Sequence, residues 1–164
     1  MYVLSSRVFA GAALVMTCIV GLAVAGPAEV AQIKPRQEKL RDIGGALKGI
    51  NDELKKRNVD WENVIQPNAQ TIKDRSAYLL NWFPKGSGPE SGVKTYALPA
   101  IWQNFADFQT VGKAAQMEAI RLNEAAQKKD LNAVKTIVFA TGNACKSCHD
   151  KYRSPDFEKD SEDE

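Results

Sequence analysis

The chain of 164 residues carries 22 Lys and Arg against 20 Asp and Glu, and 44% of it is hydrophobic. This length and apolar content suit one compact globular domain and exclude a largely disordered chain. Three Cys are too few for a fold held by a disulfide framework. The near-neutral charge balance argues against a nucleic-acid-binding protein.

Residues 1–25 have the organisation of a secretory signal peptide. Arg7 precedes an uncharged apolar run over residues 8–25, and Ala23-Val24-Ala25 has the small-x-small form of a signal-peptidase site. The alternative is a retained membrane helix, since this run has the minimum length that spans a bilayer. We interpret the segment as a signal that sends the chain to the bacterial periplasm, without stable membrane insertion of the mature protein.

After residue 25 the chain is predicted to be helical throughout. Apolar side chains recur at alternating spacings of three and four along residues 40–54, 69–83, 101–126 and 131–152, which places them on one face of each helix. No segment shows the period-2 alternation of a strand. We therefore predict an all-α fold, an up-down-up-down four-helix bundle.

Turn and capping residues set the expected boundaries of these helices. Asp60 is a candidate N-cap of the second helix, which Pro67 either kinks or starts. The Pro, Gly and Ser of residues 84–91 predict a loop. Pro99 is expected to open the third helix and Asp130 to cap the fourth.

The charge changes sign near the end of the chain. Residues 26–153 hold 20 basic and 14 acidic side chains, whereas residues 154–164 hold six acidic side chains and one Lys. Blocks of like charge are typical of solvated tails. We expect residues 26–153 to form the folded domain and residues 154–164 an acidic disordered tail, which alternatively screens the domain or selects a partner.

The chemistry is concentrated in the motif Cys145-Lys146-Ser147-Cys148-His149. The order C-x-x-C-H is the attachment signature of c-type haem, with two thioether bonds to the porphyrin and an imidazole placed to ligate the iron. A zinc site needs four ligands, and only two Cys and one His follow residue 25. A thioredoxin-like pair needs a strand before it, and a disulfide bridges such a helical spacing poorly.

The position of the motif bears on the second axial ligand of the iron. Only 15 residues follow His149, none of them Met or His, and Met117 is the one Met after residue 25. In an antiparallel helix pair turning at Lys129, His149 lies level with about Gln109, on the order of 12 Å from Met117 along the axis. We therefore predict that the sixth coordination position has no protein ligand.

Aromatic residues gather at the end of the predicted bundle that holds the motif. An ordinary aromatic core explains any one of them, but the skew of the set suits the faces of a macrocycle. The set comprises Tyr78, Trp82, Phe83, Tyr96, Trp102, Phe105, Phe108 and Tyr152.

Four motifs within about residues 33–153 resemble cytochrome c′, the class II c-type cytochromes. They are Arg36-Gln37-x-x-Leu40, Trp82-Phe83-Pro84, Leu98-Pro99-Ala100-Ile101-Trp102, and Cys145-Lys146-Ser147-Cys148-His149-Asp150-Lys151-Tyr152-Arg153. The resemblance implies one haem c, anchored by Cys145 and Cys148 and ligated at the iron by His149. It also implies a cation at Arg153 near the imidazole, propionate contacts from Arg36 and Gln37, and weaker candidates for that contact in Thr95 and Tyr96.

Leu40 separates two branches of this family. The related low-spin proteins of the c-556 kind have an iron-binding Met at this position, whereas high-spin cytochromes c′ have an apolar residue that is not a ligand. Leu40 also fits a plain core residue of the helix seam. With the resemblance, we expect Leu40 to form a dry distal pocket over a pentacoordinate, high-spin haem.

These residues lead to three functional hypotheses. A pocket without a hydrogen-bond donor favours NO and CO over O2, so the first is a gas-binding haem protein. The second is a single-electron carrier, high-spin or of the low-spin c-556 kind, whose basic domain docks acidic redox partners. The third, a peroxidase or NO reductase, lacks a second His as distal proton donor, so we expect no enzyme and no catalytic residues. Similar proteins are often homodimers through their first two helices, which an exposed Val59 or Val64 would permit.

Overall fold

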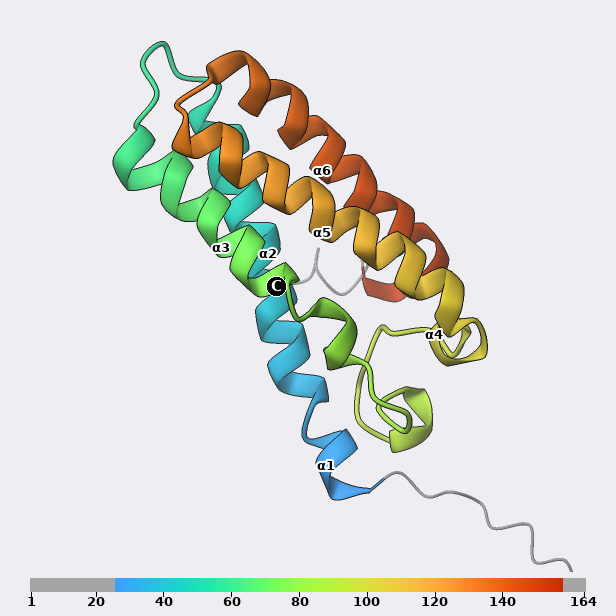
Figure 1. Cartoon of the computed structure of the whole chain (residues 1–164). Helices are drawn as coiled ribbons and strands as arrows, with labels where there is room; N and C mark the ends of the chain where they lie inside the picture. Colours follow the sequence, from blue (N-terminus) through green and yellow to red (C-terminus); the bar gives the residue numbers. More distant parts are fainter. Residues whose placement is uncertain (1–25, 158–164) are drawn as a thin grey trace, which may run out of the picture.

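The computed structural model describes residues 26–157, so the predicted signal peptide and residues 158–164 of the predicted tail lie outside the described residues. Four long helices form an antiparallel bundle with up-down-up-down connections, as predicted (Figure 1). They are α2 (Ile33–Glu53), α3 (Gln66–Ser76), α5 (Phe105–Gln127) and α6 (Leu131–Tyr152). Within residues 26–157 there is no β-strand, and the only extended pairing is a bridge between Ala97 and Arg153.

Short helices lead into the bundle and occupy its connections. They are α1 (Pro27–Val30), the π-helix η1 (Trp61–Ile65), the 3-10 helices η2 (Leu79–Trp82) and η3 (Pro89–Ser91), and α4 (Ala100–Gln103). Among the helices of residues 26–157, none is both long and apolar enough to cross a bilayer.

The second predicted helix begins and ends differently from the expectation. Asp60 accepts a hydrogen bond from the amide of Asn63 at 2.9 Å, so it caps the π-turn η1, and Pro67 then lies in the first turn of α3. The α-helix stops at Ser76 rather than at residue 83. The predicted apolar face nevertheless continues into η2, because Leu79 is buried there and Phe83 follows it into the core.

The third predicted helix is two helices. Asn104 leaves helical geometry, with φ −132° and ψ 58°, and separates α4 from α5. Its side-chain oxygen accepts a hydrogen bond from the amide of Asp107, so Asn104 is the N-cap of α5. Asp130 caps α6 as predicted, by accepting from the amide of Ala133 at 3.0 Å.

The core divides into an aliphatic part and an aromatic part. The aliphatic cluster lies in the half of the bundle that holds the α5–α6 turn and contains Ala46, Ile50, Ile65, Ala69, Ile72, Ala119, Leu122, Ala125, Ala126, Val134 and Val138. The aromatic cluster lies where α6 ends and contains Leu79, Trp82, Phe83, Ile101, Phe108 and Tyr152, with Trp102 and Phe105 packed against it. Two predicted members are absent, because Tyr78 is 65% exposed and the ring of Tyr96 packs on Phe157.

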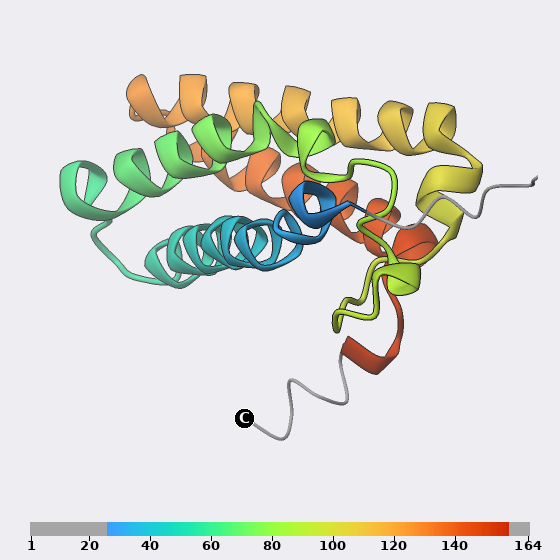
Figure 2. The ribbon, with the colours of Figure 1, turned by 90° about the horizontal axis from the view of Figure 1, so that it is seen from below.

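Residues 84–98 form a loop that closes the aromatic end of the bundle (Figure 2). The chain after α6 runs back along this loop: the amide of Leu98 donates to the carbonyl of Tyr152 at 2.9 Å, and the amide of Ser154 donates to the carbonyl of Tyr96 at 2.7 Å. The start of the predicted acidic tail, residues 154–157, therefore contacts the folded domain, and the boundary at residue 153 stays a prediction.

Candidate haem site at the end of α6

The C-x-x-C-H motif occupies the last two turns of α6. Val134, Val138 and Thr141 precede it on the buried face of the helix, and the spacing carries that face on to Cys145 and Cys148. Both cysteines are free thiols and half-buried, and His149 is half-buried beside them. The intervening Lys146 points outward, where it pairs with Asp150 at 2.6 Å.

The two thiols lie in an environment that disfavours their ionised form. Burial raises the pKa of Cys145, and burial together with the neighbouring Cys145 raises the pKa of Cys148 to about 11, against a smaller opposing effect of Arg153. Both side chains are therefore neutral thiols at pH 7.

The inward face of α2 lies opposite the motif. Leu40 and Ile43 pack against the aromatic cluster, and so does Cys148 from the side of α6. Leu40, Ile43 and Leu47 are nevertheless only half-buried, whereas Ile50, deeper in the bundle, is fully buried. The protein therefore leaves apolar surface of α2 uncovered at the level of the cysteines.

The α6 side of this interface is also incompletely filled. A Cβ added to the half-buried Gly142, one turn before Cys145, meets no atom within 4 Å. α2 packs mainly on α3, and α6 mainly on α5, so α2 and α6 make few direct contacts with each other. Two thiols and an imidazole on α6, with apolar side chains on α2, are the groups that a covalently attached haem requires.

Edge-to-face aromatic contacts make the floor of the site rigid. The ring of Phe108 lies 4.9 Å from that of Phe83 and 5.2 Å from that of Tyr152, both edge-on. The Tyr152 hydroxyl donates to a carboxylate oxygen of Asp107 at 2.5 Å, and Lys151 donates to the same atom at 3.0 Å. Burial and this carboxylate raise the pKa of Tyr152 to about 12, so the hydroxyl remains a donor that ties the end of α6 to the start of α5.

Arg36 lies inside the protein, with 2% of its surface exposed. Its guanidinium donates to the carbonyl of Trp82 at 3.2 Å, to the hydroxyl and carbonyl of Ser87 at 2.9 Å each, and to the hydroxyl of Thr95 at 3.0 Å. It also lies 4.5 Å from the centroid of the Phe83 ring. Burial lowers the pKa of Arg36 to about 10, opposed by the charge of Glu90, so the side chain stays protonated at neutral pH.

The structure thus brings Arg36, Gln37 and Thr95 together around the loop. The side-chain amide of Gln37 donates to the carbonyl of Lys94 at 3.1 Å. Arg36 and Gln37 thus both hold the loop against α2. Ser87, a fully buried partner of Arg36, was missed by sequence reasoning, because a Ser in a Gly- and Pro-rich loop carries no signal of burial. The propionate contacts of Arg36, Gln37, Thr95 and Tyr96 remain predictions.

Arg153 lies next to the attachment motif, whereas Met117 lies on the outer surface. Arg153 ends α6, where its amide donates to the carbonyl of His149 at 3.0 Å, and its guanidinium lies over the ring of Phe157. Met117 is 63% exposed on α5. Its side chain therefore lies on the outer surface.

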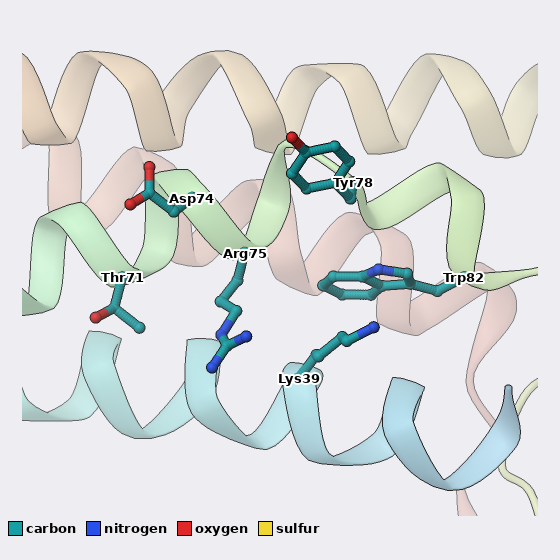
Figure 3. Close-up of a pocket in the computed structure, with 6 residues that line it drawn as sticks. All are labelled: Lys39, Thr71, Asp74, Arg75, Tyr78 and Trp82. Atoms are coloured by element: carbon teal, nitrogen blue, oxygen red, sulfur yellow. The ribbon is translucent and has the colours of Figure 1, made fainter.

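A surface hollow of about 460 Å³ lies away from the motif, between α2 and α3 (Figure 3). Lys39 lies 5.3 Å from the centroid of the Trp82 ring in this hollow, and Arg75 is paired with Asp42 at 3.1 Å. Tyr78 forms part of its rim, and no Cys or His lines it. The hollow is a feature of the outer α2–α3 face rather than of the candidate haem site.

Comparison with known proteins agrees with the geometry. The family model for cytochrome c′ matches residues 31–153. The cytochrome c′ of Rhodopseudomonas palustris is 32% identical over 140 residues, which cover 83% of this chain and 93% of that protein. The cytochrome c-556 of Agrobacterium fabrum is 30% identical over 146 residues, which cover 87% of this chain and 92% of that protein.

Solved structures with a similar fold belong to the same group of proteins. The nitric oxide complex of a mutant cytochrome c prime from Alcaligenes xylosoxidans superposes with a TM-score of 0.68 at 25% identity, and the match covers 77% of this chain and 96% of that one. Members of this family bind haem c. Since the family model spans three-quarters of the sequence, including the C-x-x-C-H motif, the chain belongs to the cytochrome c′ family of c-type cytochromes.

Proposed function

We propose that this cytochrome carries one haem c in the periplasm, with thioether bonds to Cys145 and Cys148 and with His149 as the only protein ligand of a pentacoordinate, high-spin iron. The observation that carries the proposal is that the attachment motif on α6 faces apolar side chains of α2. The three motif residues lie half-buried on one side, and Leu40 and Ile43 lie on the other. Met117, which could supply a sulfur ligand, is on the outer surface.

The residues around the site determine which ligands reach the iron. A bound haem supplies an iron that takes up a diatomic gas or exchanges one electron. Leu40 offers neither a ligand nor a hydrogen-bond donor, so it keeps the distal side dry and favours NO and CO over O2. A relative in this fold family is known as a nitric oxide complex, which supports the same ligand class here.

The remaining residues keep the site in one geometry. Arg36 holds the loop over the aromatic cluster, and the contact of Tyr152 with Asp107 fixes the last turn of α6, which carries His149. Leu40 and Ile43, which lie opposite the motif, cannot donate the proton that peroxide chemistry requires. We therefore propose binding and electron transfer rather than catalysis.

Two measurements on the purified mature protein test this proposal. Intact mass should show one haem that survives acid extraction, and Cys145→Ser together with Cys148→Ser should abolish the gain. The ferrous optical spectrum should be high-spin and should change on addition of CO. A six-coordinate, low-spin spectrum that CO does not alter would refute the vacant sixth position.

An electron carrier is the second candidate function. The similarity to a cytochrome c-556 and the net positive charge of residues 26–153 favour it, because a basic surface promotes encounter with an acidic redox partner. Electron-transfer rates that fall steeply with ionic strength, together with weak NO binding, would favour this function over gas binding.

We also propose that the cytochrome can dimerise through the face formed by α2 and α3. Val59 does not serve this contact as an exposed residue, because it packs against the aliphatic cluster, and Val64 is half-buried. Tyr78, 65% exposed at the rim of the hollow in Figure 3, is the better candidate. Analytical ultracentrifugation of wild type and Tyr78→Ser tests this contact.

A further inference from the structure

Residues 154–157 form a short strap beyond the part of the chain that matches the family model, which ends at residue 153. In Figure 2 this strap turns away from the end of α6 and lies beside the loop of residues 84–98. Its backbone is fixed at Ser154, whose amide donates to the carbonyl of Tyr96 at 2.7 Å. The Ser154 hydroxyl then holds the turn by accepting from the amide of Asp156 at 3.2 Å.

The end of the strap places an aromatic ring between two side chains predicted to belong to the haem site. The Phe157 ring meets the Tyr96 ring edge-on at 5.2 Å, with an interplanar angle of 86°. On the other side, the Arg153 guanidinium carbon lies 4.2 Å from the Phe157 ring centroid, the arrangement of a cation–π contact. Tyr96 thus holds the strap through its backbone carbonyl and its ring together.

Arg153 lies directly after the attachment motif. Its amide donates to the carbonyl of His149 at 3.0 Å, so Arg153 follows that residue by one helical turn. An arginine side chain at a helix end has several rotatable bonds, so its position depends on the contacts that it makes. The ring of Phe157 provides one of these contacts.

We propose that the strap fixes the guanidinium of Arg153 at the end of α6, one turn after His149, with Phe157 as the positioning residue, and thereby raises the reduction potential of the attached haem. This inference rests on the proposed haem attachment. Oxidised haem iron carries one more positive charge than reduced iron, so a cation held nearby disfavours the oxidised form. Release of Arg153 into water weakens that effect, because water screens the charge.

Equilibrium redox titration of the full-length holoprotein tests the coupling. Arg153→Gln and Phe157→Ala should each lower the potential, and Phe157→Ala should reproduce at least half of the Arg153→Gln shift. The double variant should go no lower than Arg153→Gln alone, because both changes remove the same interaction. Phe157→Tyr keeps a ring and should retain the wild-type potential. Phe139→Ala, which removes a ring 72% exposed on α6, is the matched control and should leave the potential unchanged.

Amide hydrogen exchange tests the strap without reference to the iron. The Ser154 amide should exchange about tenfold faster in Phe157→Ala than in wild type or Phe139→Ala, since the strap then opens more easily. Equal potentials for Phe157→Ala and Phe139→Ala, or shifts that add in full in the double variant, would overturn the inference and leave the proposed function standing. A purified chain without covalent haem would overturn both.

Discussion

Leu40 lies on the inward face of α2, and none of its atoms can donate a lone pair to iron. It packs against the same aromatic cluster as Cys148, so a longer side chain with a sulfur atom at this position reaches toward the same space. Its neighbour two turns along, Leu47, packs against the aliphatic cluster instead. The two leucines therefore offer a matched pair of positions on one helix.

We expect Leu40→Met to convert the haem toward a six-coordinate, low-spin state, because the thioether supplies the missing axial ligand. The change is measured by the optical spectrum of the ferrous protein and by a slower rate of CO binding. Leu47→Met should keep the wild-type spectrum. A Leu40→Met protein that remains high-spin would show that this wall of the site does not face the iron.

Arg36 is a second residue whose effect can be isolated. Its guanidinium donates to Trp82 and to two loop residues, Ser87 and Thr95, and Arg36→Met removes this donor from their oxygens. Unsatisfied buried polar groups and a lost charged donor cost about 2 to 4 kcal/mol in unfolding free energy. Urea unfolding measures this cost. Gln37→Ala, which removes one exposed bond to the same loop, should cost less than about 1 kcal/mol.

If Arg36→Met cost no more than Gln37→Ala, the loop would not depend on the buried guanidinium. Arg36→Lys adds a further distinction, since an ammonium keeps the charge but cannot present the planar fork that reaches Ser87 and Thr95 together. It should recover only part of the lost stability.

At the scale of whole elements, two of the three glycines of α2, Gly45 and Gly49, have different surroundings. A Cβ at the exposed Gly45 meets nothing within 4 Å, whereas a Cβ at Gly49 lies 3.0 Å from the side-chain nitrogen of Asn68. Asn68 is held in place by its bond to the carbonyl of Val64 at 2.8 Å. Gly49 thus serves the close approach of α2 to α3.

Gly45→Ala should stabilise the protein by about 0.5 to 1 kcal/mol, because alanine loses less backbone entropy than glycine in a helix. Gly49→Ala should give little or no gain, because the displaced Asn68 offsets the benefit. Chemical unfolding of both variants checks the difference. Equal gains would mean that α2 and α3 separate easily at this point.

The helix boundaries show which features of a helix the apolar periodicity predicts and which it does not. Spacing of apolar residues identified the buried faces of α3, α5 and α6, and Asp130 capped α6 as its position before an apolar run indicated. In α2, only Ile50 of the predicted face is fully buried, and Leu40, Ile43 and Leu47 are half-buried. The break at Asn104 was not found, since Ile101, Phe105 and Phe108 keep a helical spacing across it. Periodicity reports which side of a segment is buried and does not distinguish one helix from two that share a face.

At the scale of the whole molecule, Asp107 connects the start of α5 to the end of α6. Its bonds from the Tyr152 hydroxyl and the Lys151 ammonium lower its pKa. A carboxyl whose pKa is lowered by folding stabilises the protein above its unfolded-state pKa, and that contribution is lost as the pH falls through the folded-state value. The closure of the haem end is therefore sensitive to acid.

We expect the unfolding free energy of wild type to fall as the pH drops below about 4, and to fall less steeply in Tyr152→Phe, in which the pKa of Asp107 lies closer to its ordinary value. Thermal or urea unfolding between neutral and acidic pH measures the two profiles. Tyr78→Phe, at an exposed ring, is the control. Parallel profiles for wild type and Tyr152→Phe would show that this contact does not contribute to acid sensitivity.

The helical class and the attachment motif can be read from the amino-acid order alone, because both follow from spacing within one segment. Cys145, Cys148 and His149 are close in the sequence, so their relative positions stay the same in any fold that makes this segment helical. The match of the family model to residues 31–153 confirms the family that the motifs indicated.

Only the tertiary structure decided what Arg36 and residues 154–157 do. The partners of Arg36 lie 46 to 59 residues away in the chain, and the strap pairs with Tyr96 across the end of the bundle. Hydrogen bonds between distant segments depend on the path of the loop that joins them. A pattern of apolar spacing contains no information on that path, because loop residues are neither periodic nor uniformly buried.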